Sequence, residues 1–261
     1  MINPYQKKIL LLAIHAGEIM LKNGAETSRV EDTITRICKA CRIDRIETFA
    51  TPTGIFISLD KGGENDDTQT FIKRIHGAST DLNKISKINS FSREFTTTDL
   101  SVEEGMEILK EIENEKPYPM PVRMLGAAMI ASFFSVIFGG NMIDFCVALV
   151  DGVICYTLSC FLGRYPINPF IISFCCCGVA AFIALLAVST VPGASYSSII
   201  IGTLMIFVPG VAITNSIRDF LSGDMLSGVS RMMEAFLIAV SLAAGVGFVM
   251  KLWYMLGGLP V

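Results

Sequence analysis

This chain is organised around residues 206–228, which read Ile206-Phe-Val-Pro-Gly-Val-Ala-Ile-Thr-Asn-Ser-Ile-Arg-Asp-Phe-Leu-Ser-Gly-Asp-Met-Leu-Ser-Gly228. They continue an uncharged apolar run that starts at Ser197 and is interrupted by Pro209-Gly210. Proline lacks an N–H and clashes with the preceding helical turn, so we expect a helix to kink or unwind there. Interrupted hydrophobic segments mark transporter sites, because exposed backbone in a bilayer must line protein or water. The residues are therefore a candidate substrate path, with a simple bend in a packing helix as the alternative.

Charge divides the chain sharply. Residues 1–118 hold 16 of the 21 Lys and Arg residues and 19 of the 24 Asp and Glu residues. The later residues carry five basic and five acidic side chains, too few to cover a surface that faces water. We predict a cytoplasmic soluble α/β domain over residues 1–118 and a transmembrane domain over residues 119–261. The signs of charge alternate without a basic stripe, which argues against nucleic acid as a partner.

The soluble part alternates between two periodicities. Apolar spacing and capping signals predict helices, and runs of β-branched and aromatic residues predict strands. Asn23-Gly24 should end the first helix, which forms a hairpin with the second, and Ser101 with Glu104 should cap the last. We expect helices at 5–22, 26–41, 80–91 and 101–115, a strand at 46–59 that is kinked near Pro52 and Gly54, a loop at 60–67 and a returning strand at 68–75.

The apolar part predicts an all-α membrane bundle of five transmembrane helices, each near the ~20 residues that a bilayer core requires. They lie at about 120–138, 143–162, 168–190, 197–216 and 232–253. The connections that carry Arg164, Arg218 and Arg231 should share the cytoplasmic side with the amino terminus, by the positive-inside rule. Five spans then place the carboxyl terminus outside, although Lys251 near that end disagrees. We expect a multi-pass membrane protein with a cytoplasmic amino terminus.

A polar stripe runs along the second predicted span. Asp144, Ala148, Asp151, Cys155 and Ser159 fall on one helix face, with Asp151 near the middle of the span. A carboxyl at that depth is costly and usually serves an ion or proton pathway, so Asp151 and Asp144 are candidate coupling residues. A protonated Asp151 that is hydrogen-bonded to a neighbouring helix is the alternative. Glu234 is a weaker candidate, because Arg231 three residues earlier could pair with it.

Small residues repeat along two other spans. Ala239, Ala243 and Gly247 form one such face, and the second consists of Cys177, Ala180, Ala181, Ala184 and Ala187. Such faces let helix backbones approach closely, so we expect them to pack against partner helices, some from outside this chain.

The cysteines do not indicate a metal or a cofactor. Cys38 and Cys41 form a single CxxC within a predicted helix, and the remaining cysteines lie in apolar spans, where a thiol behaves as a small hydrophobe. His15 and His76 belong to different elements. We expect reduced thiols, no metal and no cofactor.

Three ordered motifs resemble the threonine/serine exporter (ThrE) family over nearly the whole chain. They are Asn23-Gly24-Ala25-Glu26-Thr27, the strand at 51–59 and residues 209–228. The likeness is greatest to the large subunit of the split form of the family (YjjP-like), which acts with a small membrane subunit (YjjB-like). The resemblance implies an oligomeric secondary transporter of the bacterial cytoplasmic (inner) membrane that exports threonine and serine, or a dicarboxylate such as succinate.

The resemblance places family motifs on particular residues of this sequence. They are Pro209, Gly210, Asn215, Arg218 and Asp219 as the substrate-binding candidates, and Asn23, Gly24, Glu26 and Thr27 as a motif of the soluble domain. On physical grounds Arg218 is the natural bidentate partner of a carboxylate, and Asn215 with freed carbonyls near Pro209 could hold an ammonium or hydroxyl group.

Two other classes of function compete with transport. The chain could be a regulatory or assembly scaffold whose partner forms the transport path. An enzyme is the weakest alternative, because residues 1–118 contain no G-x-S-x-G turn or other catalytic context. We therefore expect a transporter subunit and no enzyme.

Overall fold

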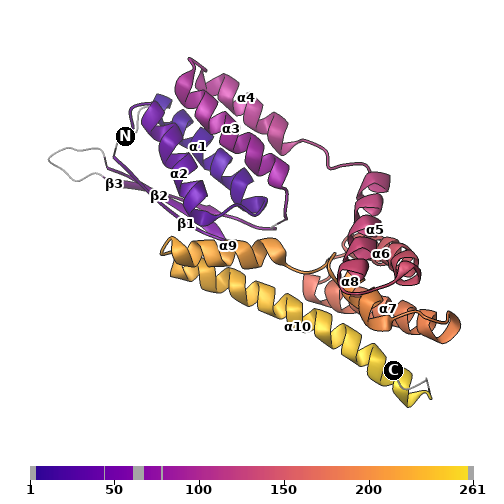
Figure 1. Cartoon of the computed structure of the whole chain (residues 1–261). Helices are drawn as coiled ribbons and strands as arrows, with labels where there is room; N and C mark the ends of the chain where they lie inside the picture. Colours follow the sequence, from indigo (N-terminus) through magenta and orange to yellow (C-terminus); the bar gives the residue numbers. More distant parts are fainter. Residues whose placement is uncertain (1–3, 44, 61–67, 78, 258–261) are drawn as a thin grey trace. The chain divides into compact units, whose positions relative to one another are not determined.

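The computed structural model describes residues 4–43, 45–60, 68–77 and 79–257 (Figure 1). The chain divides into two compact units, of which unit 1 contains Met1–Lys116 and Val211–Met233 and unit 2 contains Pro117–Gly210 and Glu234–Val261. The later part of the chain thus returns to unit 1 for one segment that the sequence analysis assigned to the membrane domain.

Unit 1 packs helices on a small sheet. Its helices are α1 (Pro4–Lys22), α2 (Thr27–Ala40), α3 (Leu82–Thr97) and α4 (Val102–Glu113), together with α9 (Gly210–Leu221) and the first turns of α10 (Met225–Met255). Ile9, Leu12, Ile34, Ile37 and Leu109 are among the fully buried side chains of its core. The predicted helical hairpin of the first two helices is confirmed, and Gly24 ends it at a φ of 87°.

The sheet of unit 1 corrects one prediction. Residues 46–59 form two antiparallel strands, β1 (Ile46–Thr51) and β2 (Gly54–Asp60), rather than one kinked strand. Thr51 pairs with Gly54, so Pro52 and Thr53 form a two-residue hairpin connection. The predicted returning strand is β3 (Thr68–Arg74), which pairs with β2 and gives the order β1-β2-β3. The predicted loop at 60–67 lies outside the described residues except for the backbone of Asp60.

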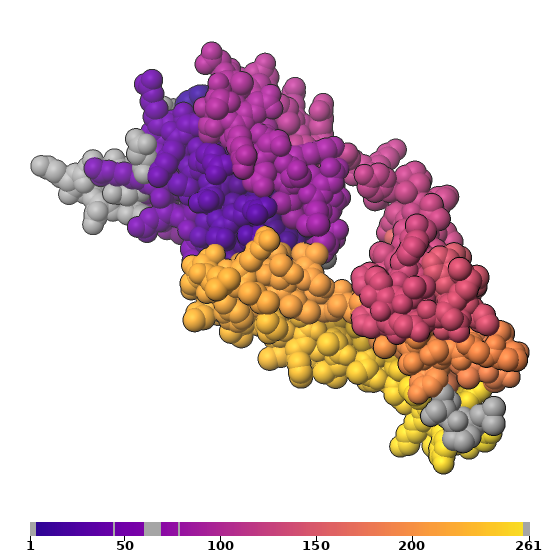
Figure 2. All heavy atoms as spheres, viewed as in Figure 1, coloured from indigo at the N-terminus to yellow at the C-terminus, as the bar shows by residue number. Residues whose placement is uncertain are grey.

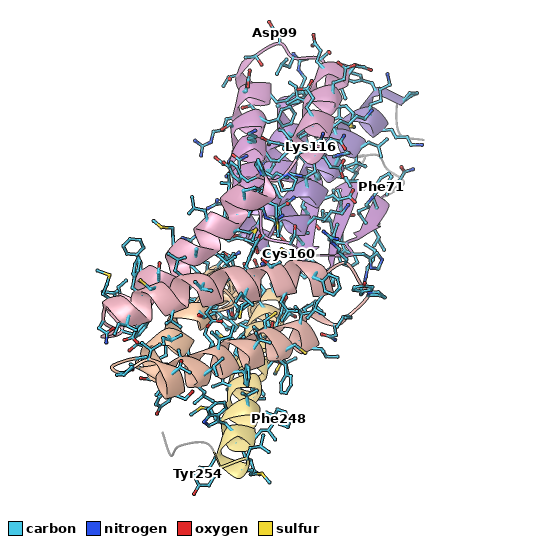
Figure 3. The ribbon with its side chains drawn as sticks, turned by 90° about the vertical axis from the view of Figure 1, so that its right-hand side faces the viewer. Phe71, Asp99, Lys116, Cys160, Phe248 and Tyr254 are labelled. Atoms are coloured by element: carbon cyan, nitrogen blue, oxygen red, sulfur yellow. The ribbon has the colours of Figure 1, made fainter. Side chains whose placement is uncertain are left out.

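Capping explains where the later helices of unit 1 begin. Asp81 accepts hydrogen bonds from the Asn83 and Lys84 amides, so α3 starts at residue 82 and runs further than predicted. Ser101 and Glu104 form the predicted capping box of α4. Asp99, labelled in Figure 3, lies in the turn between these two helices.

Unit 2 is entirely helical in its described residues. It contains α5 (Met120–Ile137), α6 (Met142–Leu162), α7 (Pro169–Thr190), α8 (Tyr196–Leu204) and the remainder of α10. Among the described residues, four helices are long and apolar enough to cross a membrane, namely α5, α6, α7 and α10. Their outward side chains, such as Phe133, Val150 and Phe182, are about half exposed, as expected of a surface that lipid covers.

The fourth predicted span is not a continuous helix. The 197–216 segment consists of α8, a turn at residues 205–209 and the first half of α9. The predicted interruption at Pro209-Gly210 is confirmed, whereas the count of five continuous spans is not. A proline cannot donate to the turn before it, which explains why α9 starts only at Gly210.

Glycines allow the helices of unit 2 to approach closely. A Cβ on Gly202 of α8 would lie 2.4 Å from the Ala131 carbonyl oxygen of α5, and one on Gly245 of α10 would lie 2.3 Å from the Phe174 carbonyl oxygen of α7. Phe248, labelled in Figure 3, adds a ring contact to Phe174 with centroids 6.0 Å apart. The predicted small face of α7 is buried throughout. Ala239, Ala243 and Gly247 of α10 are instead exposed.

Candidate functional site

The candidate residues form two separate polar groups, one in each unit. The first, which we call the α9 cluster, joins Gly24–Thr27 to Asn215, Arg218, Asp219, Asp224 and Arg231. The second, the Asp151 cluster, joins Asp151 to Thr203 and Cys155. In Figures 1 and 2, the segment that carries α9 lies directly against the amino-terminal segments of unit 1.

The turn between α1 and α2 presents its backbone to α9. Asn23 caps α1 by donating its side-chain amide to the Ile19 carbonyl at 2.7 Å, and Gly24 adopts the positive φ that the reversal requires. The Gly24 carbonyl then accepts a hydrogen bond of 2.7 Å from the side-chain amide of Asn215. The two family motifs therefore meet through a side chain and a backbone group.

Asp219 lies at the amino terminus of α2. Its Oδ1 accepts hydrogen bonds from the Thr27 backbone N–H at 3.3 Å and from the Thr27 hydroxyl at 2.9 Å. The same hydroxyl lies 3.2 Å from Oδ2 of Asp224, so its one proton is shared between two carboxylates. Burial raises the pKa of Asp219, while the hydrogen bonds from Thr27 and the charge of Arg231 oppose that rise. The helix terminus contributes because its first N–H groups lack partners and carry partial positive charge.

Arg231 of α10 contacts both the turn before α2 and Asp219 of α9. Its Nη2 donates to the Ala25 carbonyl at 2.6 Å, and its Nε lies 3.1 Å from Oδ2 of Asp219. These two atoms are buried at ion-pair distance but are not aligned as a hydrogen bond. The spacing in the sequence suggested an ion pair between Arg231 and Glu234. In the structure Arg231 pairs with Asp219, and Glu234 is exposed.

Arg218 is the accessible cation of the cluster. It forms an ion pair with Glu26, which also lies 3.3 Å from Nη2 of Arg29. The Arg218 side chain is 53% exposed, whereas Glu26 is 15% exposed. One side of the guanidinium group is therefore open to a solute.

Glu31 is a half-buried carboxyl beside this cluster. It accepts a hydrogen bond of 2.6 Å from the Ala50 amide of β1. Burial raises the pKa of Glu31, the Ala50 hydrogen bond opposes that rise, and the nearby carboxylates of Asp224, Asp32 and Asp219 reinforce it. Glu31 was not among the predicted site residues, because nothing in its local pattern distinguishes it from a solvated helix residue.

Asp151 is fully buried in unit 2, and both its oxygens have partners. Oδ2 accepts a hydrogen bond of 2.7 Å from the Thr203 hydroxyl of α8, and Oδ1 lies 3.3 Å from the Cys155 sulfur. The Cys155 sulfur also lies 3.4 Å from the Cys176 carbonyl of α7. The close packing at Gly152 and Gly202 brings the donor from α8 within reach.

Asp144 occupies the predicted face of α6 but has a capping role. It forms a capping box with Asn141 and also accepts a hydrogen bond of 2.7 Å from the Ser195 amide. It therefore ties the start of α6 to the segment before α8.

Pro209 and Gly210 lie at the start of α9, where a Cβ on Gly210 would meet nothing within 4 Å.

Asp224 and Arg231 were outside the predicted set of site residues. Their rarity was a usable signal, since they are two of only ten charged residues after residue 118.

Cys38, in the CxxC segment, has a pKa that burial raises to about 12, so its thiol stays protonated. Among the described residues, no group of three or more His, Cys, Asp and Glu could hold a metal ion.

Four long apolar helices and buried polar clusters define a multi-pass membrane protein. The chain belongs to the threonine/serine exporter (ThrE) family, which matches residues 11–253. No solved structure matches the chain.

Relatives in this family are distant and differ in length. A "probable threonine/serine exporter" of Mycobacterium tuberculosis is 22% identical over 93% of this chain and 46% of its own length. The threonine/serine exporter of Corynebacterium glutamicum is 23% identical over 94% of this chain and 51% of its own length. The Escherichia coli protein named "probable succinate transporter subunit YjjP" is 20% identical over 97% of both chains. This chain thus spans about half the length of the first two relatives. These relatives carry the names of exporters and transporter subunits, not of enzymes.

Proposed function

We propose that this chain is a subunit of a secondary transporter that exports small carboxylate-bearing metabolites, either threonine and serine or a dicarboxylate such as succinate. The observation that carries the proposal is the helix interruption between Leu204 and Gly210, followed directly by the polar residues of α9. Interrupted helices at polar clusters provide solute sites in secondary transporters.

The proposed substrate contact is Arg218. Its guanidinium group stays charged and can bind a carboxylate through two parallel hydrogen bonds, and it is half exposed. Pro209, Gly210 and Asn215 would supply backbone and amide groups for the rest of the solute, while Asp219 orients Thr27 and Arg231. Asn23, Gly24, Glu26 and Thr27 would hold α9 in place.

The proposed coupling residue is Asp151. The hydroxyl of Thr203 and the thiol of Cys155 can each rotate to donate or to accept a hydrogen bond. The Asp151 carboxyl group can therefore take up or release a proton without losing both of these hydrogen bonds. Asp144 and Glu234 would serve at the ends of the same pathway. In this proposal α8 and the turn at residues 205–209 form a fifth, discontinuous crossing, and the amino terminus and α9 are cytoplasmic.

The proposed partner is a small membrane subunit of the same family (YjjB-like). The exposed small face of Ala239, Ala243 and Gly247 supports this proposal, because such a face suits close contact with another helix. The name of the E. coli relative, a transporter subunit, supports it as well.

Efflux of labelled threonine, serine and succinate tests the proposal. Cells that lack their own exporters would express this chain with and without the small subunit. We expect efflux of at least one of the three solutes only when both subunits are present. No efflux of any of them from cells in which both subunits reach the membrane would contradict the proposal.

A scaffold role is the second candidate. The internal pairing of Arg218 with Glu26 favours it, because a purely structural ion pair would hold unit 1 together without binding a solute. On that role, conservative changes at Arg218 would reduce assembly with the partner and transport in equal proportion.

A further inference from the structure

We propose that Glu26 is a specificity-determining residue that selects zwitterionic amino acids over dicarboxylates. The inference rests on the proposed function, in which Arg218 binds the carboxylate of the substrate. In the structure that position on Arg218 is occupied by the Glu26 carboxylate. A substrate must therefore exchange with Glu26 or share the guanidinium group with it.

Glu26 occupies a helix N-cap position, where glutamate is not a preferred residue. Glu26 is the N-cap residue of α2, with φ −63° and ψ 142°, yet its side chain makes no capping hydrogen bond. Asp, Asn, Ser and Thr are the preferred residues at such a position. The capping contact comes from Asp219 instead, through the Thr27 amide. Glu26 is thus free of a capping role and extends its carboxylate to Arg218 and Arg29.

Exposure makes the exchange feasible. Arg218 is 53% exposed, so an incoming carboxylate can reach its open side before Glu26 leaves. After the exchange, Arg29 still neutralises Glu26 from 3.3 Å and keeps it beside the site. The displaced carboxylate then lies next to whatever the substrate carries beyond its first carboxylate.

The charges of the site determine which class of substrate binds more strongly next to the displaced Glu26. The ionic groups of the site are the guanidinium groups of Arg29, Arg218 and Arg231 and the carboxylates of Glu26, Asp219 and Asp224. A zwitterion adds no net charge and offers its ammonium to the displaced Glu26. A dicarboxylate adds two negative charges, and its second carboxylate meets the displaced Glu26.

The experiment compares threonine with succinate in proteoliposomes that contain the full chain, together with the small subunit if efflux requires it. The variants are Glu26→Gln, Glu26→Asp and the control Glu115→Gln, whose carboxylate pairs with Lys87 at 2.6 Å in unit 1. We expect Glu26→Gln to raise the succinate-to-threonine ratio of kcat/KM by roughly two- to fivefold, the range for one partly exposed charge pair. Glu26→Asp and Glu115→Gln should keep the parent ratio.

A second measurement needs no variant. In the parent protein, succinamate, which lacks one of the two charges of succinate, should inhibit threonine transport more strongly than succinate does. Equal inhibition, stronger inhibition by succinate, or an unchanged ratio in Glu26→Gln would each overturn the role of Glu26. If Arg218→Lys and Arg218→Gln leave transport of both solutes unchanged, the proposed substrate contact itself fails, which is a separate result.

Discussion

At the scale of single residues, the buried and half-buried carboxyls of this chain have different environments. Asp219 faces a helix amino terminus and Arg231, Glu31 faces a backbone amide, and Asp151 faces a hydroxyl and a thiol. Of these three, Asp219 has a cation, Arg231, at ion-pair distance, whereas Glu31 and Asp151 have none among the described residues. The charged forms of Glu31 and Asp151 therefore gain no ion pair.

Glu31→Gln should change how stability depends on pH. Because the pKa of Glu31 in the folded protein is raised above its usual 4.5, the folded state binds the proton more tightly than the unfolded state does. The parent therefore loses stability as pH rises from about 4.5 through the folded pKa, and Gln removes that loss while it can still accept from Ala50. Thermal unfolding in detergent should give the variant the higher midpoint at pH 7.5 and a similar midpoint at pH 4.

The control for this prediction is Glu47→Gln, an exposed residue of β1. It should shift neither midpoint. A Glu31→Gln midpoint below that of the parent at pH 7.5 would show that the ionised carboxylate stabilises the fold.

Asp151→Asn should remove proton coupling while preserving the fold. Asparagine keeps an oxygen that can accept from Thr203, so packing of α6 against α8 should survive. Efflux measured across a pH series should lose its pH dependence, with normal amounts of protein in the membrane. If the variant transports like the parent at every pH, Asp151 is a packing residue.

At the scale of elements, close contacts at glycines hold the helices of unit 2 together, and Gly245 of α10 is one of them. Gly245→Ala would place a methyl group 2.3 Å from the Phe174 carbonyl oxygen, which forces α10 away from α7. We expect a loss on the order of 1–3 kcal/mol, seen as a lower thermal midpoint in detergent. Gly247→Ala, two residues later on the same helix, meets nothing within 4 Å and serves as the matched control. Equal effects of the two substitutions would contradict this packing.

Local sequence patterns predicted most of the helices, because capping and apolar spacing act within a few residues. Ser101 with Glu104 and the turn at Gly24 were recognisable for this reason. The hairpin at Pro52 and Thr53 was not, because the apolar pattern continues on both sides of a two-residue connection. The α9 cluster could not be predicted from spacing either. Thr27 and Asp219 are separated by 192 residues, and only the folded chain shows their contact.

At the scale of the whole molecule, the few charges after residue 118 are not evenly distributed. Four of the ten, Arg218, Asp219, Asp224 and Arg231, belong to unit 1, and the remaining six are spread over unit 2. Unit 2 therefore has a surface that only lipid or other apolar helices can cover. The sequence-based border at residue 118 did not include this return of the chain to unit 1.

The proposed orientation predicts which residues an impermeant thiol reagent reaches in intact cells. Glu111→Cys on α4 should stay unlabelled if unit 1 is cytoplasmic, whereas Met142→Cys, at the exposed first residue of α6, should react. Labelling of the parent gives the background from the native cysteines. Reaction at residue 111 without reaction at residue 142 would reverse the orientation.

The most direct test of the central claim is the efflux of labelled threonine, serine and succinate by Arg218→Lys, with Lys87→Arg as a control on α3. Lysine keeps the positive charge but loses the bidentate geometry, so the KM for the exported solute should rise about fivefold or more. Assembly with the small subunit should be unchanged, because Glu26 can still pair with a lysine or with Arg29. Parent-like KM values for all three solutes, with the protein assembled, would contradict the claim that Arg218 binds the substrate carboxylate.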